Sequence, residues 1–78
     1  MQLTIKYFGL LAEVTATTEE LLETETCSVF ELVKTLKNQY PKLGDTNFKI
    51  AVDQQLIDLN YIIETNAEIA LLPPFAGG

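Results

Sequence analysis

The sequence predicts an α+β fold in which one main helix packs on one face of a mixed sheet of four to five strands. The first observation is a stretch at 28–40 whose apolar residues recur at helical spacing. The second is a set of five shorter stretches that read as strands, at 2–8, 17–24, 48–53, 56–57 and 67–72. The expected order is β-β-α-β-β-β, in one domain over residues 1–74, followed by an extended, flexible tail at 75–78.

The first two strands are predicted by alternation of apolar and polar residues. Residues 2–8 place one set of side chains on the core face: Leu3, Ile5 and Tyr7. Gly9 interrupts this pattern, and residues 10–14 are expected to form about one helical turn. Residues 17–24 then form a second strand that pairs antiparallel with the first and turns Thr and Glu toward water. The connection between them is too long for a two-residue hairpin.

The helix at 28–40 is predicted by a capping box and an apolar face. In a capping box the Ser28 hydroxyl accepts from the Glu31 N–H, and the Glu31 carboxylate accepts from the Ser28 N–H. Pro41 predicts the helix end, because proline disfavours a helical residue before it. Cys27 is interpreted as a small apolar residue packed under the helix start, with a reactive thiol as the alternative. The apolar face is Val29, Val33, Leu36 and Tyr40.

The second half of the chain is predicted to be mostly strand and loop. A loop at 42–47 precedes the strand at 48–53, and a turn at 53–55 leads into the short strand at 56–57. Residues 58–66 are expected to be an irregular connection. The strand at 67–72 follows, with its core-facing side chains at Ala67, Ile69 and Leu71.

The end of the last strand has the most informative sequence. Ala70 and Leu72 are expected on the outer face of the sheet, with Leu72 and Phe8 as a candidate exposed apolar patch; isolated rim residues are the alternative. Pro73 and Pro74 remove two backbone donors, so the sheet must end there and the chain must leave in an extended form.

The last residues of the sequence form a thin arm. Gly77 and Gly78 have no Cβ, so they can enter a channel too narrow for a bulkier tail. The four residues 75–78 can reach about 13 Å when fully extended. Phe75 follows the prolines outside the sheet, where contact with a partner would explain a large apolar side chain.

Composition excludes most other functions. The net charge is −6, with 11 acidic residues and five lysines, which disfavours binding to nucleic acid and to an anionic membrane surface. There is no histidine and only one cysteine, which excludes Ser–His and Cys–His catalysis and the common zinc sites. Without an apolar run long enough to span a membrane or a signal peptide, a cytoplasmic location is expected. The chain is expected to act with an enzyme and not as one.

Taken together, these features resemble the small, sulfur-carrier subunit of molybdopterin synthase, a family of ubiquitin-like β-grasp proteins. The specific part of the resemblance is Pro73-Pro74 followed, after two residues, by Gly77-Gly78. The other matching segments are Tyr7-Phe8-Gly9, Ser28-Val29, residues 51–55 and residues 68–72. The resemblance covers essentially the whole chain.

The resemblance implies a specific chemistry at Gly78. An activating enzyme uses ATP to adenylate its carboxylate, and a sulfur donor protein then converts the adenylate to a thiocarboxylate. The thiocarboxylate gives its sulfur to a cyclic pyranopterin phosphate in the large subunit. The implied assembly is a 2+2 heterotetramer, and this chain binds no metal or cofactor. The partner's channel would receive Pro73, Pro74, Phe75, Ala76 and Gly77, with Phe8 and Leu72 at the interface.

Three other functions stay open at this point. A sulfur carrier of thiamine synthesis would share the fold and the Gly-Gly end, although Pro73-Pro74 and the chain length favour the molybdopterin family. A ubiquitin-like protein modifier would instead be joined through Gly78 to lysines of target proteins. An inert β-grasp interaction module would make no use of Gly78 at all.

Overall fold

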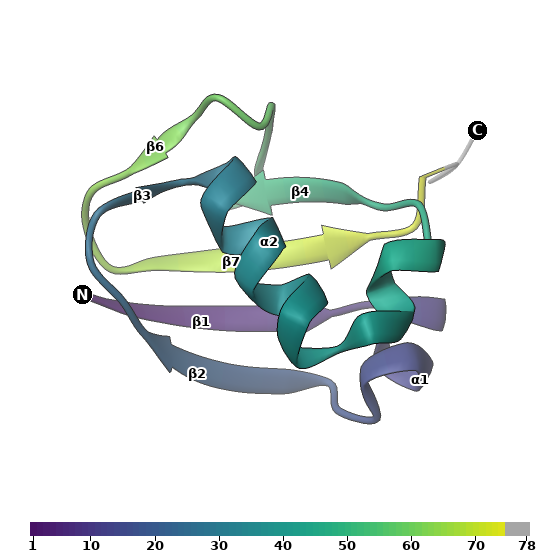
Figure 1. Ribbon diagram of the computed structural model, residues 1–78. Helices are drawn as coiled ribbons and strands as arrows, with labels where there is room; N and C mark the ends of the chain where they lie inside the picture. Colours follow the sequence, from purple (N-terminus) through teal and green to yellow (C-terminus); the bar gives the residue numbers. More distant parts are fainter. Residues whose placement is uncertain (75–78) are drawn as a thin grey trace.

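The structure, a computed structural model, describes residues 1–74. One helix, α2 (Val29–Gln39), crosses one face of a five-stranded sheet with strand order β2-β1-β7-β4-β5 (Figure 1). A separate two-stranded ribbon pairs β3 with β6. The predicted layer of one main helix on a mixed sheet is confirmed. The strands are β1 (Gln2–Tyr7), β2 (Glu19–Glu23), β3 (Cys27–Ser28), β4 (Lys49–Val52), β5 (Gln55–Ile57), β6 (Ile62–Ile63) and β7 (Ala67–Leu72).

The last strand, β7, occupies the middle of the sheet. It pairs parallel with β1 on one side and antiparallel with β4 on the other, while β1 also pairs antiparallel with β2. The β4–β5 hairpin turns through Asp53 and Gln54, both at positive φ (49° and 70°), as two-residue turns of this kind require. Asp53 also bonds to β7: its N–H donates to the Glu68 carbonyl at 2.9 Å, and its carboxylate accepts from the Glu68 N–H at 3.0 Å.

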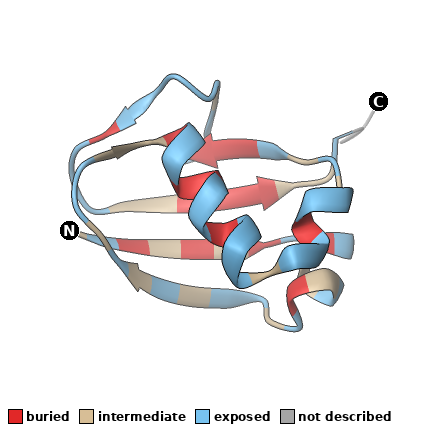
Figure 2. Cartoon of the chain, viewed as in Figure 1, coloured by how far each residue is buried: buried red, intermediate tan, exposed pale blue. Residues whose placement is uncertain are grey.

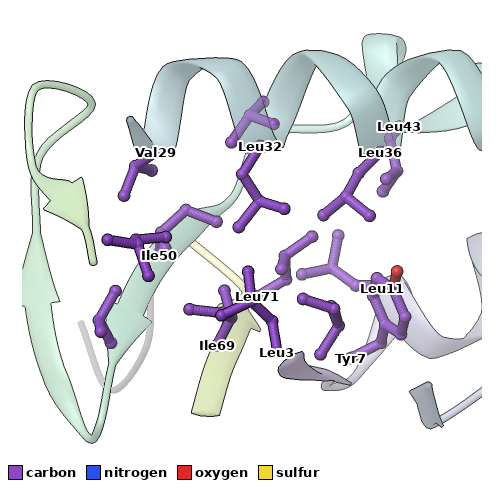
Figure 3. Packing of buried hydrophobic residues seen from close by; sticks show 14 residues of the cluster. Leu3, Tyr7, Leu11, Val29, Leu32, Leu36, Leu43, Ile50, Ile69 and Leu71 are labelled. Carbon is purple, nitrogen blue, oxygen red and sulfur yellow. The ribbon is translucent and has the colours of Figure 1, made fainter. Parts of the chain in front are cut away.

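The core lies between α2 and the inner face of the sheet (Figure 3). The side chains predicted to face it from β1 are all buried, as are Ile69 and Leu71 from β7, whereas Ala67 is half-buried. In α2 the face toward the sheet is buried and the opposite face is exposed (Figure 2). The predicted helical face was incomplete, because Leu32 is also buried. The buried residues of α2 are Val29, Leu32, Val33 and Leu36.

The capping box predicted at the start of α2 is present. The Ser28 hydroxyl accepts from the Glu31 N–H at 3.1 Å, and the Glu31 carboxylate accepts from the Ser28 N–H at 2.9 Å. Cys27, just before it, is half-buried and packs against the core. Burial, followed by the negative charge of Glu31, raises the pKa of the Cys27 thiol. The contact of Cys27 with the core confirms its interpretation as a packing residue.

Two segments predicted to be irregular have regular structure. Residues 41–45 form the 3₁₀ helix η1 (Pro41–Asp45) instead of a loop, anchored by Leu43, which is fully buried. Residues 58–66 contain β6. Two carbonyls of that segment accept from the first amides of α2: Leu59 from Phe30 at 3.0 Å and Tyr61 from Val29 at 2.9 Å. The segment is ordered because it satisfies donors that a helix start leaves unpaired.

The short predicted turn after Gly9 is confirmed as helix α1 (Leu10–Thr15). Pro41 follows the end of α2, also as predicted.

Tyr40, at the end of α2, is half-buried and reaches across to β2. The hydroxyls of Tyr7 and Tyr40 each donate to the same oxygen of Glu20 at 2.6 Å, and their rings meet edge to face with centroids 5.8 Å apart.

This tyrosine pair predicts a loss of stability at alkaline pH. Burial and Glu20 raise the pKa of Tyr7 above its usual value of 10.0, and the bond to Glu20 raises the pKa of Tyr40. Above pH 10 the unfolded chain then loses protons that the folded chain keeps. We expect the free energy of unfolding to fall by about 1 kcal/mol per pH unit through Tyr7 alone.

Urea unfolding at pH 9, 10 and 11 measures this slope. Tyr7→Phe should reduce the fall above pH 10, although it lowers stability at pH 9 by removing one bond to Glu20. Tyr61→Phe, at an exposed tyrosine, is the matched control and should keep the full slope. Equal slopes in all three proteins would contradict the prediction.

Candidate functional site

The candidate site is the base of the predicted tail, which we call the tail base and define as Phe8, Gly9, Leu72, Pro73 and Pro74. Because β1 and β7 are parallel, their C-terminal ends lie at the same end of the sheet (Figure 1). Tyr7 pairs with Leu71, and the Phe8 N–H donates to the Leu71 carbonyl at 3.2 Å. The chain that leaves β7 therefore emerges beside the turn that follows β1.

Exposure to solvent increases along the chain at the end of β7. Leu71 is buried, Leu72 and Pro73 are half-buried, and Pro74 is exposed. Leu72 is the last residue of β7 and pairs with Lys49 at the start of β4. The prediction that the strand ends at the first proline is confirmed. β7, which pairs with a strand on each side, thus leads directly into the two prolines of the tail base. The position of these prolines relative to the sheet is therefore fixed.

Gly9 and Pro73 approach each other closely. Gly9 has a positive φ of 56°, and a Cβ added there would lie 3.1 Å from Cγ of Pro73. The Gly9 carbonyl also accepts from the Ala12 N–H at 3.0 Å at the start of α1. Alternation along β1 marked Gly9 only as a break. Its contact with Pro73 follows from the parallel β1–β7 pairing, which the sequence alone did not predict.

Gly9→Ala is expected to lower stability by about 1–2 kcal/mol. Positive φ strains an alanine, and its Cβ would press against the Pro73 ring. Gly44→Ala is the control, because a Cβ at Gly44 meets nothing within 4 Å and φ there is ordinary. Chemical denaturation of both variants tests this prediction. Similar losses in the two proteins would show that the contact with Pro73 has no cost.

Large apolar side chains lie in the tail base and directly after Gly9 in the sequence. Phe8 is 45% exposed, and Leu72 lies on the outer face as predicted, half-buried. Leu10, 58% exposed at the start of α1, was not predicted as a candidate. The sequence signal was the pair Leu10-Leu11. Two adjacent residues of so short a helix point in different directions, and Leu11 is the one that is buried.

The other predicted site residues, Phe75, Ala76, Gly77 and Gly78, lie outside the described residues. Within residues 1–74, no group of three or more His, Cys, Asp or Glu side chains is placed to hold a metal ion. No helix in the same range is both long and apolar enough to cross a membrane. The tail base fixes the position from which the chain leaves the sheet, and exposed apolar residues lie beside it. This arrangement is suited to presenting the following residues to a partner.

Comparison with known proteins gives a family and a fold. The model of the ThiS family matches residues 5–78. The human molybdopterin synthase sulfur carrier subunit is 29% identical over 83 residues, covering 99% of this chain and 94% of the human protein.

Two solved structures share the fold. One is subunit 1 in the complex of subunits 1 and 2 of molybdopterin-converting factor from Helicobacter pylori, with a TM-score of 0.69 and 27% identity over all of both chains. The other is small archaeal modifier protein 1 from Haloferax volcanii, with a TM-score of 0.81 and 19% identity, covering 94% of this chain and 97% of that one. The predicted ubiquitin-like β-grasp fold is confirmed.

Proposed function

The chain belongs to the ThiS family, and on that premise we propose that it is the sulfur carrier of a molybdopterin synthase. The observation that carries the proposal is the tail base. A central strand ends at Pro73-Pro74, and the sequence continues for four residues to Gly77-Gly78. The human relative and the Helicobacter pylori subunit are both molybdopterin proteins, which supports this pathway over thiamine synthesis.

In the proposed reaction the Gly78 carboxylate is first made electrophilic. Attack of the carboxylate on ATP forms an acyl-adenylate and releases pyrophosphate; sulfur delivered at the oxidation level of sulfide by the donor then displaces AMP and leaves a thiocarboxylate. The thiocarboxylate sulfur attacks the cyclic pyranopterin phosphate, and hydrolysis of the acyl link restores the carboxylate. This chain supplies the acyl group and the arm. The absence of histidine and arginine from its sequence assigns acid–base and phosphate-binding work to the partners.

The proposed partners are a large catalytic subunit, an adenylating enzyme and a sulfur donor protein. The Helicobacter pylori complex supports the first, because a subunit of this fold binds its subunit 2 there. We propose the same pairing here, in a 2+2 heterotetramer. The negative charge of the chain favours basic surfaces around the partners' channels. The carrier itself holds no cofactor in this scheme, and ATP is used by the activating enzyme.

Mass spectrometry of the C-terminal peptide tests the proposal directly. The chain is incubated with ATP, an activating enzyme and a sulfur source, and the C-terminal peptide is then isolated. The expected product has one oxygen replaced by sulfur at Gly78, and it forms only when ATP is present. An unmodified C-terminal peptide under conditions that load a known carrier would refute the proposal.

A protein modifier is the alternative that shares this fold. Its product would be an isopeptide bond between Gly78 and a target lysine, which tryptic digestion leaves as a remnant of residues 50–78 on that lysine, because Lys49 is the last basic residue of the sequence. Finding such remnants in cells, with no thiocarboxylate, would favour the modifier. The experiment therefore separates the two functions by the atom attached to the same carbonyl.

Phe75→Ala is expected to weaken binding to the large subunit by about 2 kcal/mol. An aromatic side chain beside the tail base would fill an apolar pocket at the mouth of the partner's channel, and such anchors dominate binding energy. Isothermal titration calorimetry measures the change. Leu21→Ala, at an exposed leucine of the sheet edge strand β2, is the control and should leave the affinity unchanged. Unchanged affinity in Phe75→Ala would argue against an anchoring role.

A further inference from the structure

A groove lies between α2 and the β4–β5 edge of the sheet, and none of the tail-base residues lines it. Its volume is about 420 Å³, with Phe30 and Lys34 on the helix side and Phe48 and Leu59 on the sheet side. A wider depression of about 800 Å³ adjoins it and shares Phe48 and Leu59 as a common wall. We call the two together the helix–edge groove. The two hollows adjoin each other along this flank of the domain.

Apolar surface is concentrated in the helix–edge groove. Phe30 is 55% exposed, Leu59 48% and Leu56 61%, although all three are large apolar residues. Single exposed apolar residues are common on proteins. Several around one hollow are characteristic of a surface that binds another molecule. Ile50, a buried residue of the core cluster, lines both hollows, so part of their lining belongs to the core.

The charge of the groove is opposite to that of the chain. Lys34, Lys37 and Lys49 line it, three of five lysines in a chain of net charge −6. Asp58 is the only acid lining the two hollows in the described part of the chain. The Nζ atom of Lys37 lies 6.0 Å from the centroid of the Phe48 ring, so this cation lies over an aromatic residue that lines the groove.

The spacing along α2 makes this arrangement regular. Phe30, Lys34 and Lys37 stand at i, i+4 and i+7, which places them on one stripe of the helix, beside the stripe that packs on the core. The neighbouring carboxylate of Glu31 is bonded to the Ser28 N–H in the capping box. One stripe of α2 thus combines an aromatic side chain with two cations.

We propose that the helix–edge groove binds an acidic, apolar peptide segment of a partner protein. One or two apolar side chains of the segment enter the hollow between Phe30 and Leu59. Carboxylates on either side of them pair with Lys34 and Lys37. β5, an edge strand that pairs only with β4 in the described sheet, allows the segment to lie extended alongside it. Because the groove does not include the tail base, a partner can hold the domain there while the arm is engaged elsewhere.

A displayed library of random peptides tests the proposal and leaves the partner's identity open. A phage library of random 12-residue peptides is selected on the immobilised chain, and enriched peptides are synthesised. We expect sequences that combine Asp or Glu with Leu, Ile, Phe or Trp. Titration of the ¹⁵N-labelled chain with them should shift the amide signals of Phe30, Lys34, Phe48 and Leu59. Enrichment of basic or uncharged peptides, or of none, would overturn the proposal.

Two pairs of variants locate the binding. Phe30→Ala should weaken the peptides about tenfold, whereas Leu21→Ala, an equally exposed apolar site on the opposite edge strand, should not. Lys34→Glu should weaken them about fivefold, and Lys42→Glu, the same charge change outside the groove, by less than twofold. Equal effects within either pair would overturn the proposal, as would amide shifts confined to the tail base.

Two further measurements separate this proposal from its rivals. Sedimentation of the chain alone tests whether a second copy occupies the groove; self-association abolished by Phe30→Ala would replace the peptide with another copy. The thiocarboxylate assay is run in parallel on the groove variants. Phe30→Ala and Lys34→Glu can lose peptide binding while the chemistry at Gly78 continues, so failure of one proposal does not imply failure of the other.

Discussion

Removal of Gly78 should abolish sulfur transfer while the domain stays folded. The proposed reaction passes through the Gly78 carbonyl, and deletion moves the carboxylate back by one residue, about 3.5 Å along an extended chain. A displacement of about 1 Å at a reacting centre can already cost about a hundredfold in rate. We therefore expect molybdopterin formation to fall by at least about a thousandfold. The assay is single-turnover conversion of the cyclic pyranopterin phosphate with reconstituted large subunit.

Addition of one residue after Gly78 is the complementary variant and should have the same effect. Here the carboxylate is moved forward, and the added Cβ enters the space that suits glycine. Circular dichroism and urea unfolding of both variants should match those of the unaltered chain, because the core lies within residues 1–74. Activity within tenfold of the unaltered chain, in either variant, would exclude Gly78 as the reactive end.

Ile69→Ala should be the most damaging single change to the fold among those considered. Ile69 is fully buried on the central strand β7, between β1 and β4 and beneath α2 (Figure 3). Truncation of such a side chain removes apolar burial and leaves a cavity, at a cost of about 3 kcal/mol. For a domain of this size that corresponds to a fall of about 15 °C in Tm.

Leu21→Ala is the control for this prediction as well, because Leu21 is 61% exposed on the edge strand β2 and should cost less than about 0.5 kcal/mol. Thermal unfolding followed by circular dichroism measures both variants. A loss below about 1 kcal/mol for Ile69→Ala would mean that the core repacks around the missing atoms. Sulfur transfer by this variant should fall only in proportion to the unfolded fraction, since Ile69 is a residue of the buried core and not of the tail base.

Local sequence signals predicted the elements that depend on neighbouring residues. The alternation in β1, the Ser28–Glu31 capping box and the break at Pro73 depend on short stretches of sequence, and all three are present. The alternation predicted for β7 is incomplete, because Ala70 is buried as well as Ile69 and Leu71. Elements that depend on distant residues were missed. β6 exists because β3 pairs with it and because α2 needs acceptors for its first amides. η1 is regular because Leu43 has a place in the core.

The candidate site shows the same division. The sequence indicated Phe8, Leu72 and the two prolines, because exposed apolar residues and strand-ending prolines can be recognised locally. The contact between Gly9 and Pro73 depends on parallel pairing of the first and last strands, which no short stretch reveals. The charge reversal in the helix–edge groove was missed for the same reason: Lys34 and Lys37 line one hollow and Lys49 the adjoining one, and these segments come together only in the folded domain.

The central position of β7 has a consequence for biosynthesis. The chain is made from its N-terminus, yet β1 and β4 cannot be joined into one sheet until residues 67–72 have been synthesised. Contacts between such distant segments also slow folding, because the intervening chain must be ordered first. A chain cut short before residue 67 therefore lacks both the strand that completes the domain and the arm beyond it. Prematurely terminated products should remain unfolded and be degraded, so they cannot compete with intact carriers for the same partners.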